Sequence, residues 1–308
     1  MAAAAPTSLR TFRDVIFRPA LAACFPWTKG FAFLNRIAAR EDVFPESTAE
    51  AIAGAASVAP IADERDWKRR YRLTRLVDHC DLFLMRTRGR RWFERHVDVE
   101  GEWPAKGPFI AMTFHWGAGL WALGCMHESG VPVRFVAARM DKEQLRDHPV
   151  VARYARWRLR TVERAGGGPV IYTGGASAAI QRALADGHAV VALYDIPAVM
   201  TSKTLWTTVC GRPVALPAGM ANLAVESGVP VIAFEMGFDY RTGRRQLRIE
   251  PAFVPVSAQD FADRLAVSMT RLLGIDTAAW HFSALAPHFF RTQEIPTAPL
   301  SLANQVGA

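Results

Sequence analysis

Three polar residues in this chain each follow an apolar run typical of a buried strand, and together they could transfer a proton. They are His115 after the run 109–114, Arg139 after the run 131–137, and Asp195 after the run 189–194. Because the carboxyl ends of neighbouring parallel strands meet at one edge of a sheet, we expect these side chains to converge. An imidazole beside a carboxylate can act as a general base on a hydroxyl, since the carboxylate fixes the tautomer and stabilises the imidazolium.

The same residues also have a structural explanation. A histidine flanked by aromatic residues, as His115 is, is as often a hydrogen-bonded core residue as a general base. The sequence has no G-x-S-x-G nucleophile elbow, no Walker A motif and no G-x-G-x-x-G after a strand. It also has no group of residues at the spacing of metal ligands, so we expect neither a metal nor a cofactor.

The elements that must position these residues alternate between strand and helix. Strands are expected at 109–114, 131–137, 170–172, 189–194, 230–234 and 247–253, and helices at 63–95, 141–164, 177–185, 218–227 and 258–273. Alternation of this kind predicts an α/β fold with a mixed, mostly parallel central sheet flanked by helices. We divide the chain into an N-terminal helical segment (1–60), an α/β domain (61–290) and a C-terminal tail (291–308).

The N-terminal segment differs in composition from the rest. Its apolar stretch 15–39 is interrupted by Arg18, Lys29 and Arg36, so no run reaches the roughly 18 apolar residues that a membrane-spanning helix needs. No cleavage site of a signal peptide follows a compact apolar core. Aromatic side chains beside Arg and Lys suit a segment that lies in a membrane interface. The alternative is that this segment packs on the α/β domain.

Composition narrows the classes of partner. The 308 residues are 50% hydrophobic, which is enough for a large core, and the net charge of +8 favours acidic partners. These partners include anionic lipids, phosphorylated substrates, nucleic acid and an acidic carrier protein. Only the positive charge favours nucleic acid as a partner, and charge is not sufficient evidence, so we do not expect nucleic acid to bind. The four cysteines lack CxxC spacing and indicate free thiols in a reducing compartment.

Several short blocks follow one another along the chain: FHWG at 114–117, ARMD at 138–141, the stretch 174–187, CGRP at 210–213, LPAG at 216–219 and the stretch 228–232. These blocks resemble the late acyltransferases of lipid A biosynthesis, the lauroyl and myristoyl transferases of the lysophospholipid acyltransferase superfamily. Their order and spacing carry the resemblance, which covers about residues 67–253.

The resemblance implies a glycerolipid acyltransferase-like fold and transfer of a fatty acyl chain from an acyl carrier protein or acyl-CoA thioester. The acceptor would be a hydroxyl of a membrane glycolipid or phospholipid, at the cytoplasmic face of the inner membrane. His115 would be the general base, with an oxyanion held by backbone N–H groups near Gly117 and Gly119, or at Gly211. The expected substrate-binding residues are Arg139, Arg158 and Arg160 for an acceptor phosphate, and Gly117, Gly211, Arg212 and Gly219 around the cleft.

The chain departs from the family at one position. The family's first motif places an acid five residues after its histidine, where this sequence has Leu120. Either another carboxylate orients His115, with Asp195 the first candidate and Glu235 the second, or ordinary catalysis has been lost. The second possibility predicts a non-catalytic lipid-binding or acyl-carrier-binding protein on the same fold.

Overall fold

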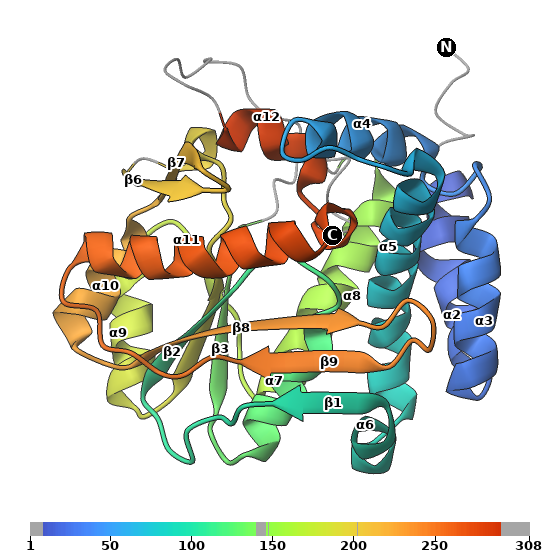
Figure 1. Ribbon diagram of the computed structural model, residues 1–308. Helices are drawn as coiled ribbons and strands as arrows, with labels where there is room; N and C mark the ends of the chain where they lie inside the picture. The colour runs from blue at the N-terminus through green and yellow to red at the C-terminus, as the bar shows by residue number, and fades with distance from the viewer. Residues whose placement is uncertain (1–8, 140–145, 147, 202, 291–308) are drawn as a thin grey trace.

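A computed structural model describes residues 9–139, 146, 148–201 and 203–290, and its fold is α/β (Figure 1). The tail predicted at 291–308 lies outside the described residues. A seven-stranded sheet forms the centre, in the order β1-β9-β8-β2-β5-β3-β4. Every neighbouring pair in it is parallel except β8 and β9, which confirms the predicted mixed, mostly parallel sheet.

The strands are short, and most are apolar on both faces. They are β1 (Val97–Glu100), β2 (Phe109–Thr113), β3 (Val133–Ala137), β4 (Ile171–Tyr172), β5 (Ala189–Leu193), β8 (Val231–Phe238) and β9 (Arg245–Ile249). Continuous apolar runs such as β2 and β5 are typical of parallel strands with helices on both faces. A separate antiparallel hairpin, β6 (Thr204–Val209) and β7 (Arg212–Pro217), follows β5 in a stretch where no strand was expected.

Helices cover both faces of the sheet. Side chains of α5 (Glu64–Thr87), α7 (Leu120–Glu128) and α8 (Pro149–Gly166) share a core with Phe109 and Ala111 of β2. Side chains of α9 (Ser177–Ala185), α10 (Gly219–Ser227) and α11 (Ala258–Ile275) share a second core with Ile110 and Met112. Successive side chains of a strand point to opposite faces, so a single apolar run supplies both cores. The helix expected at 63–95 ends at Thr87, and α6 (Arg90–His96) begins after Gly89.

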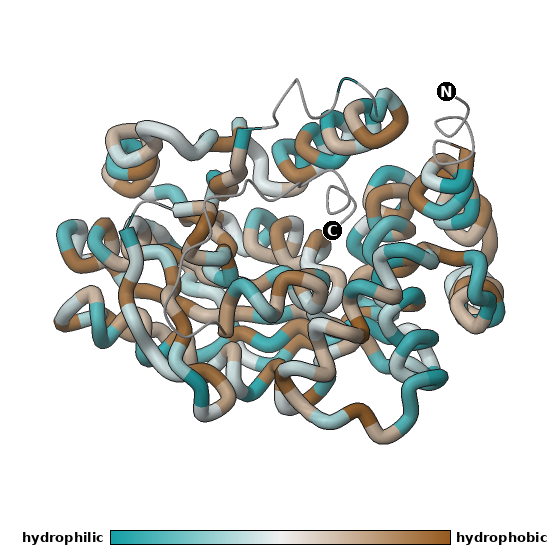
Figure 2. The backbone as a smooth tube through the Cα atoms, turned by 90° about the horizontal axis from the view of Figure 1, so that it is seen from above, coloured by the Kyte–Doolittle hydropathy of each residue, from teal (hydrophilic) through white to brown (hydrophobic). Residues whose placement is uncertain are grey.

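The N-terminal segment is helical and packs on α5 (Figure 1). It comprises a π-helical turn (Arg13–Phe17), α2 (Arg18–Ala23), α3 (Trp27–Ala38) and α4 (Pro45–Ala56). Trp27 is buried, and its indole nitrogen donates to the Gly243 carbonyl at 2.9 Å. Apolar and polar stretches alternate along these helices (Figure 2). Among the described helices, none is both long enough and apolar enough to span a membrane.

One face of this segment is not covered by any residue that the structure describes. Large apolar side chains are exposed there at Leu9, Phe12, Phe17, Leu21 and Phe25. Buried residues such as Val15, Ala22 and Trp27 face the domain instead. The segment therefore has two apolar sides in the folded protein, one packed on the domain and another facing outward.

Candidate active site

A cavity of about 920 Å³ opens at the carboxyl ends of the parallel strands. Residues that follow β2, β3 and β5 form one side of it, and helices α7 and α8 form another wall. Its lining is mainly apolar and includes Leu123, Phe135, Leu159 and Val162. A large apolar cleft at this edge of an α/β sheet is the usual place for a ligand.

His115 and Asp195 meet at this cavity. β2 and β5 are neighbours with Thr113 opposite Leu193, so the residues two positions beyond each strand lie side by side. The His115 Nδ1 atom is 3.0 Å from Asp195 Oδ1, which confirms the contact expected from the strand ends. The backbone N–H of His115 also donates to both carboxylate oxygens, at 3.0 and 2.9 Å.

This contact fixes the imidazole in one orientation. Asp195 is fully buried, whereas the His115 side chain is 17% exposed and lines the cavity. A carboxylate accepts hydrogen bonds, so Nδ1 carries the proton and Nε2 carries the lone pair. No group in the described part of the chain hydrogen-bonds Nε2. This arrangement of an oriented imidazole with one open nitrogen suits a general base.

A segment after α11 completes the surroundings of the pair. The indole N–H of Trp280 donates to Asp195 Oδ2 at 2.8 Å. The N–H of His281 donates to the His115 carbonyl at 2.7 Å. The ring of Phe282 stacks on the His115 ring with centroids 3.8 Å apart. These three residues are not among those predicted for the site, and the aromatic run 280–282 was the signal in the sequence that could have indicated them.

His281 has a structural environment that differs from that of His115. Its Nε2 donates to the Gly117 carbonyl at 2.7 Å, and its side chain is buried. Burial lowers the pKa of His281 to about 4, although the nearby Asp78 carboxylate acts in the opposite direction. The imidazole is therefore neutral near pH 7, and it holds the loop after His115 in place.

We expected the backbone N–H of Gly117 to donate to an oxyanion, but this N–H already has a partner. Its N–H donates to the Ala279 carbonyl at 2.9 Å, and its carbonyl is bonded to His281. The residue lines the cavity with a φ of 71°, and a Cβ there would collide with the Met236 carbonyl oxygen. Its role in the structure is a close backbone approach that only glycine permits. Gly119, just before the first turn of α7, also lines the cavity.

The expected arginine site is only partly assembled. Arg158 lines the cavity, but its guanidinium binds both oxygens of Asp78, at 2.7 and 3.1 Å. Burial acts to raise the pKa of Asp78, but Arg158 outweighs it, so the pKa lies below its ordinary value. The charge of Arg158 is thus already neutralised. Arg139 is exposed at the cavity and lies 5.4 Å from the Tyr172 ring centre, with no ion pair in the described part of the chain.

The remaining expected residues divide into two groups. Gly219, at the start of α10, lines the cavity. Arg160 lies on the exposed face of α8, and Gly211 forms the β6–β7 turn with a φ of 72°. Arg212 donates to the carbonyls of Ser57 and Phe290, so it ties the hairpin to the N-terminal segment. None of these three is among the residues that line the cavity in the described part of the chain.

Glu235, the second candidate acid, is not the carboxylate that orients His115. Glu235 lies on β8, where Phe234 faces the cavity and the next side chain therefore points to the opposite face. There its carboxylate pairs with Arg271 of α11 at 2.7 Å. Burial raises the pKa of Glu235 despite this contact. Glu235 is thus an ion-pair partner of α11, and Asp195 is the acid beside His115.

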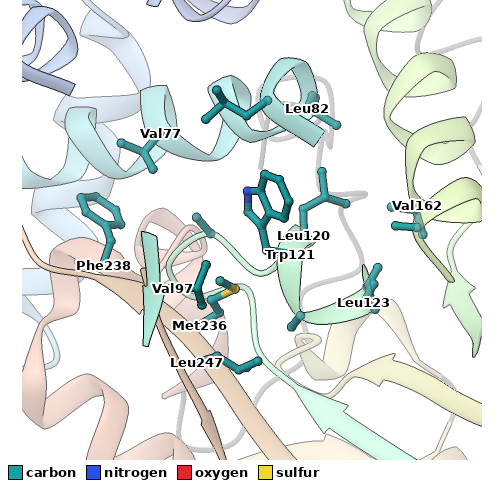
Figure 3. Packing of buried hydrophobic residues seen from close by; sticks show 14 of the residues in the cluster. Val77, Leu82, Val97, Leu120, Trp121, Leu123, Val162, Met236, Phe238 and Leu247 are labelled. Carbon is teal, nitrogen blue, oxygen red and sulfur yellow. The ribbon is translucent and has the colours of Figure 1, made fainter. Parts of the chain in front are cut away.

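Leu120 stands where the acyltransferases that this chain resembles have an acid, five residues after the histidine. Leu120 is 4% exposed and packs beside Trp121 in the core beneath α5 (Figure 3). A carboxylate at that position would lose hydration without a described partner.

Within the described residues, no group of three or more His, Cys, Asp or Glu side chains could hold a metal ion. Neither the protein-family models nor the curated proteins with which the chain was compared include a match to it.

Proposed function

We propose that this protein is an acyltransferase that moves a fatty acyl chain from an acyl carrier protein or acyl-CoA thioester to a membrane-lipid hydroxyl. The acceptor is a glycolipid or phospholipid. The observation that carries the proposal is the His115–Asp195 pair. His115 lines a large apolar cavity, and its Nε2 has no hydrogen bond to a residue that the structure describes. The resemblance of the blocks between residues 67 and 253 to lipid A acyltransferases supports the same chemistry.

In the proposed reaction, His115 Nε2 accepts the proton of the acceptor hydroxyl as its oxygen attacks the thioester carbonyl. The tetrahedral intermediate then collapses, the ester forms, the carbon–sulfur bond breaks, and the imidazolium returns its proton to the leaving thiolate. Asp195 stabilises the imidazolium between these steps. Since the Gly117 N–H is already bonded, the first-turn N–H groups of α7 near Gly119 and Leu120 are the better oxyanion donors.

The cavity offers a separate environment for each part of the substrates. Leu123, Phe135 and Val162 provide apolar walls for an acyl chain. Arg139 is the cation at the cavity that is not neutralised by a described carboxylate, so it is the residue proposed to bind an acceptor phosphate. Arg158 instead holds Asp78 and shapes the wall.

A membrane surface is the proposed working environment. The outward apolar side chains of the N-terminal segment, such as Phe12, Phe17 and Leu21, suit shallow insertion between lipid headgroups. The net charge of +8 attracts an anionic leaflet. The cytoplasmic face of an inner membrane offers such a surface. It also offers the reducing conditions in which cysteines, such as the four free ones here, stay reduced.

The decisive experiment supplies purified protein with an acyl carrier protein or coenzyme A thioester and vesicles of membrane lipid, and detects acylated lipid by mass spectrometry. We expect His115→Ala to lower turnover by roughly 100-fold or more, the range for a lost general base. His127→Ala is the matched control, because His127 is exposed on α7 and does not line the cavity. Near-full turnover by His115→Ala would refute the proposed role.

Leu120 motivates a second candidate, a lipid-binding or acyl-carrier-binding protein without catalytic activity. The family's acid is missing at that position, although Asp195 provides a carboxylate from elsewhere. Tight binding of acylated carrier or lipid with no turnover of any thioester by the wild-type protein would favour this candidate over the enzyme.

A further inference from the structure

Helix α8 carries a row of positive charge on its outer face. Arg153, Arg156, Arg160 and Arg164 follow one another at spacings of three, four and four residues, and each is exposed. Residues at such spacings lie above one another on a helix. We call these four residues the arginine stripe. At about 1.5 Å per residue, it extends over roughly 16 Å.

The stripe differs from the charged surfaces of α5 and α11. On α5, Lys68 pairs with Glu64 four residues away, and Arg264 pairs with Asp260 in the same way on α11. In the part of the chain that the structure describes, no carboxylate forms an ion pair with any arginine of the stripe. Arginines four residues apart repel one another, so the stripe weakens the helix rather than stabilising it. Such a charge row favours an acidic partner.

The stripe lies on the back of a cavity wall. On the inner side of α8, Ala155, Leu159 and Val162 line the cavity that holds His115. At the end of the stripe, Arg164 borders a smaller groove of about 200 Å³ together with Arg86 and Arg90. A partner that binds the stripe would therefore rest against the wall of the cavity.

We propose that the arginine stripe docks an acidic helical surface of the carrier protein that presents the acyl thioester. The inference rests on the proposed function and deepens it, because it selects a protein-borne donor over acyl-CoA. A row of four charges suits an extended acidic helix, whereas a coenzyme would need a compact phosphate site. A lipid surface fits less well, since no large apolar side chain of α8 is exposed for insertion.

The test reverses two charges at the centre of the stripe, in the variant Arg156→Glu/Arg160→Glu. Its control is Arg65→Glu/Arg241→Glu, which makes the same change in net charge at two other exposed arginines that form no described ion pair. Binding of acyl carrier protein is measured by calorimetry at low and high salt. Turnover is compared between acyl carrier protein, acyl-CoA and acyl-pantetheine thioesters.

We expect the stripe variant to bind acyl carrier protein at least about 10-fold more weakly and to lose its salt dependence, because rim charges steer association. Its kcat/KM should fall by a similar factor with the carrier substrate and stay unchanged with acyl-pantetheine. Equal carrier binding by the stripe variant and the control would overturn the inference, as would a loss of anionic-vesicle binding without a loss of carrier binding. If the wild-type protein turned over no thioester, the proposed function would fail, but carrier binding would still decide the role of the stripe.

Discussion

Asp195 and Asp78 are two buried aspartates beside the same cavity, and they differ in the partner that each one holds. Asp78 binds the guanidinium of Arg158 through both oxygens, and that cation cannot lose its charge in the accessible pH range. Asp195 binds the imidazole of His115 and the indole of Trp280, and the imidazole can gain and lose a proton. The first is a closed ion pair, whereas the second can take part in proton transfer.

The partners of Asp195 and Asp78 also differ in whether a nitrogen remains available to a substrate. His115 lines the cavity, and its Nε2 is free of hydrogen bonds to described residues. The guanidinium of Arg158 is occupied by Asp78. A buried carboxylate is therefore weak evidence of a catalytic site until its partner is known. We expect substitutions at Asp78 to affect mainly folding and those at Asp195 to affect mainly turnover.

The largest expected effect is on folding, in Asp78→Asn. This change leaves the partly buried guanidinium of Arg158, which is 23% exposed, without a counter-charge, so we expect a loss of about 3 kcal/mol of unfolding free energy, the lower end of the range for breaking a buried pair. Urea unfolding followed by circular dichroism measures the loss. The double variant Asp78→Asn/Arg158→Met is the control, because removing the cation should restore much of the stability. An unfolding free energy equal to that of the wild-type protein in Asp78→Asn would contradict the closed-pair interpretation.

The next effect is on turnover, in Asp195→Asn. The amide can still orient the His115 ring, but it cannot stabilise the imidazolium, so we expect a roughly 10- to 100-fold loss of kcat. The unfolding free energy should fall by less than in Asp78→Asn, because no guanidinium loses its counter-charge. Steady-state kinetics and urea unfolding of the same preparation separate the two effects. A variant that keeps its kcat but unfolds readily would make Asp195 a structural residue like Asp78.

The contact between His115 and Asp195 could be predicted because of the strands that carry them. Runs such as 109–114 and 189–194 are apolar throughout, which is typical of buried parallel strands, and polar residues at their ends meet at one sheet edge. The hairpin of β6 and β7 was missed because its strands are mixed in polarity. Its turn residues Cys210 and Gly211 both have positive φ, at 51° and 72°, which is typical of a tight hairpin turn.

Partners that are distant in sequence could not be predicted. Arg158 and Asp78 are 80 residues apart, and nothing local distinguishes an arginine that is paired from one that is free to bind phosphate. Trp280 is 85 residues from Asp195, and a buried indole usually serves packing. Such contacts depend on how α8 and the segment after α11 dock on the sheet, which periodicity does not specify.

The smallest effect is expected in Trp280→Phe, which removes the indole N–H from Asp195 Oδ2 and keeps an aromatic ring. Asp195 would retain its bonds to His115 but lose one that fixes its second oxygen. We expect kcat to fall by roughly 3- to 10-fold, or about 0.7–1.4 kcal/mol, with little change in KM. This is less than the about 1.5–3 kcal/mol of a hydrogen bond to a charged group, because the bonds from His115 still hold the carboxylate. Nitrogen-15 NMR of the imidazole should show a smaller share of the tautomer protonated at Nδ1.

Trp67→Phe is the matched control for that variant. Trp67 is also buried, and its indole donates to Thr277 Oγ1 at 2.9 Å, within the same segment that carries Trp280. Both variants lose a buried indole hydrogen bond and some packing, so their unfolding free energies should fall by similar amounts. Only Trp280→Phe removes a bond to Asp195, so only that variant should change kcat and the His115 tautomer. An equal loss of kcat in both variants would mean that the segment acts through folding alone, and Asp195 would then be held by His115 without help from Trp280.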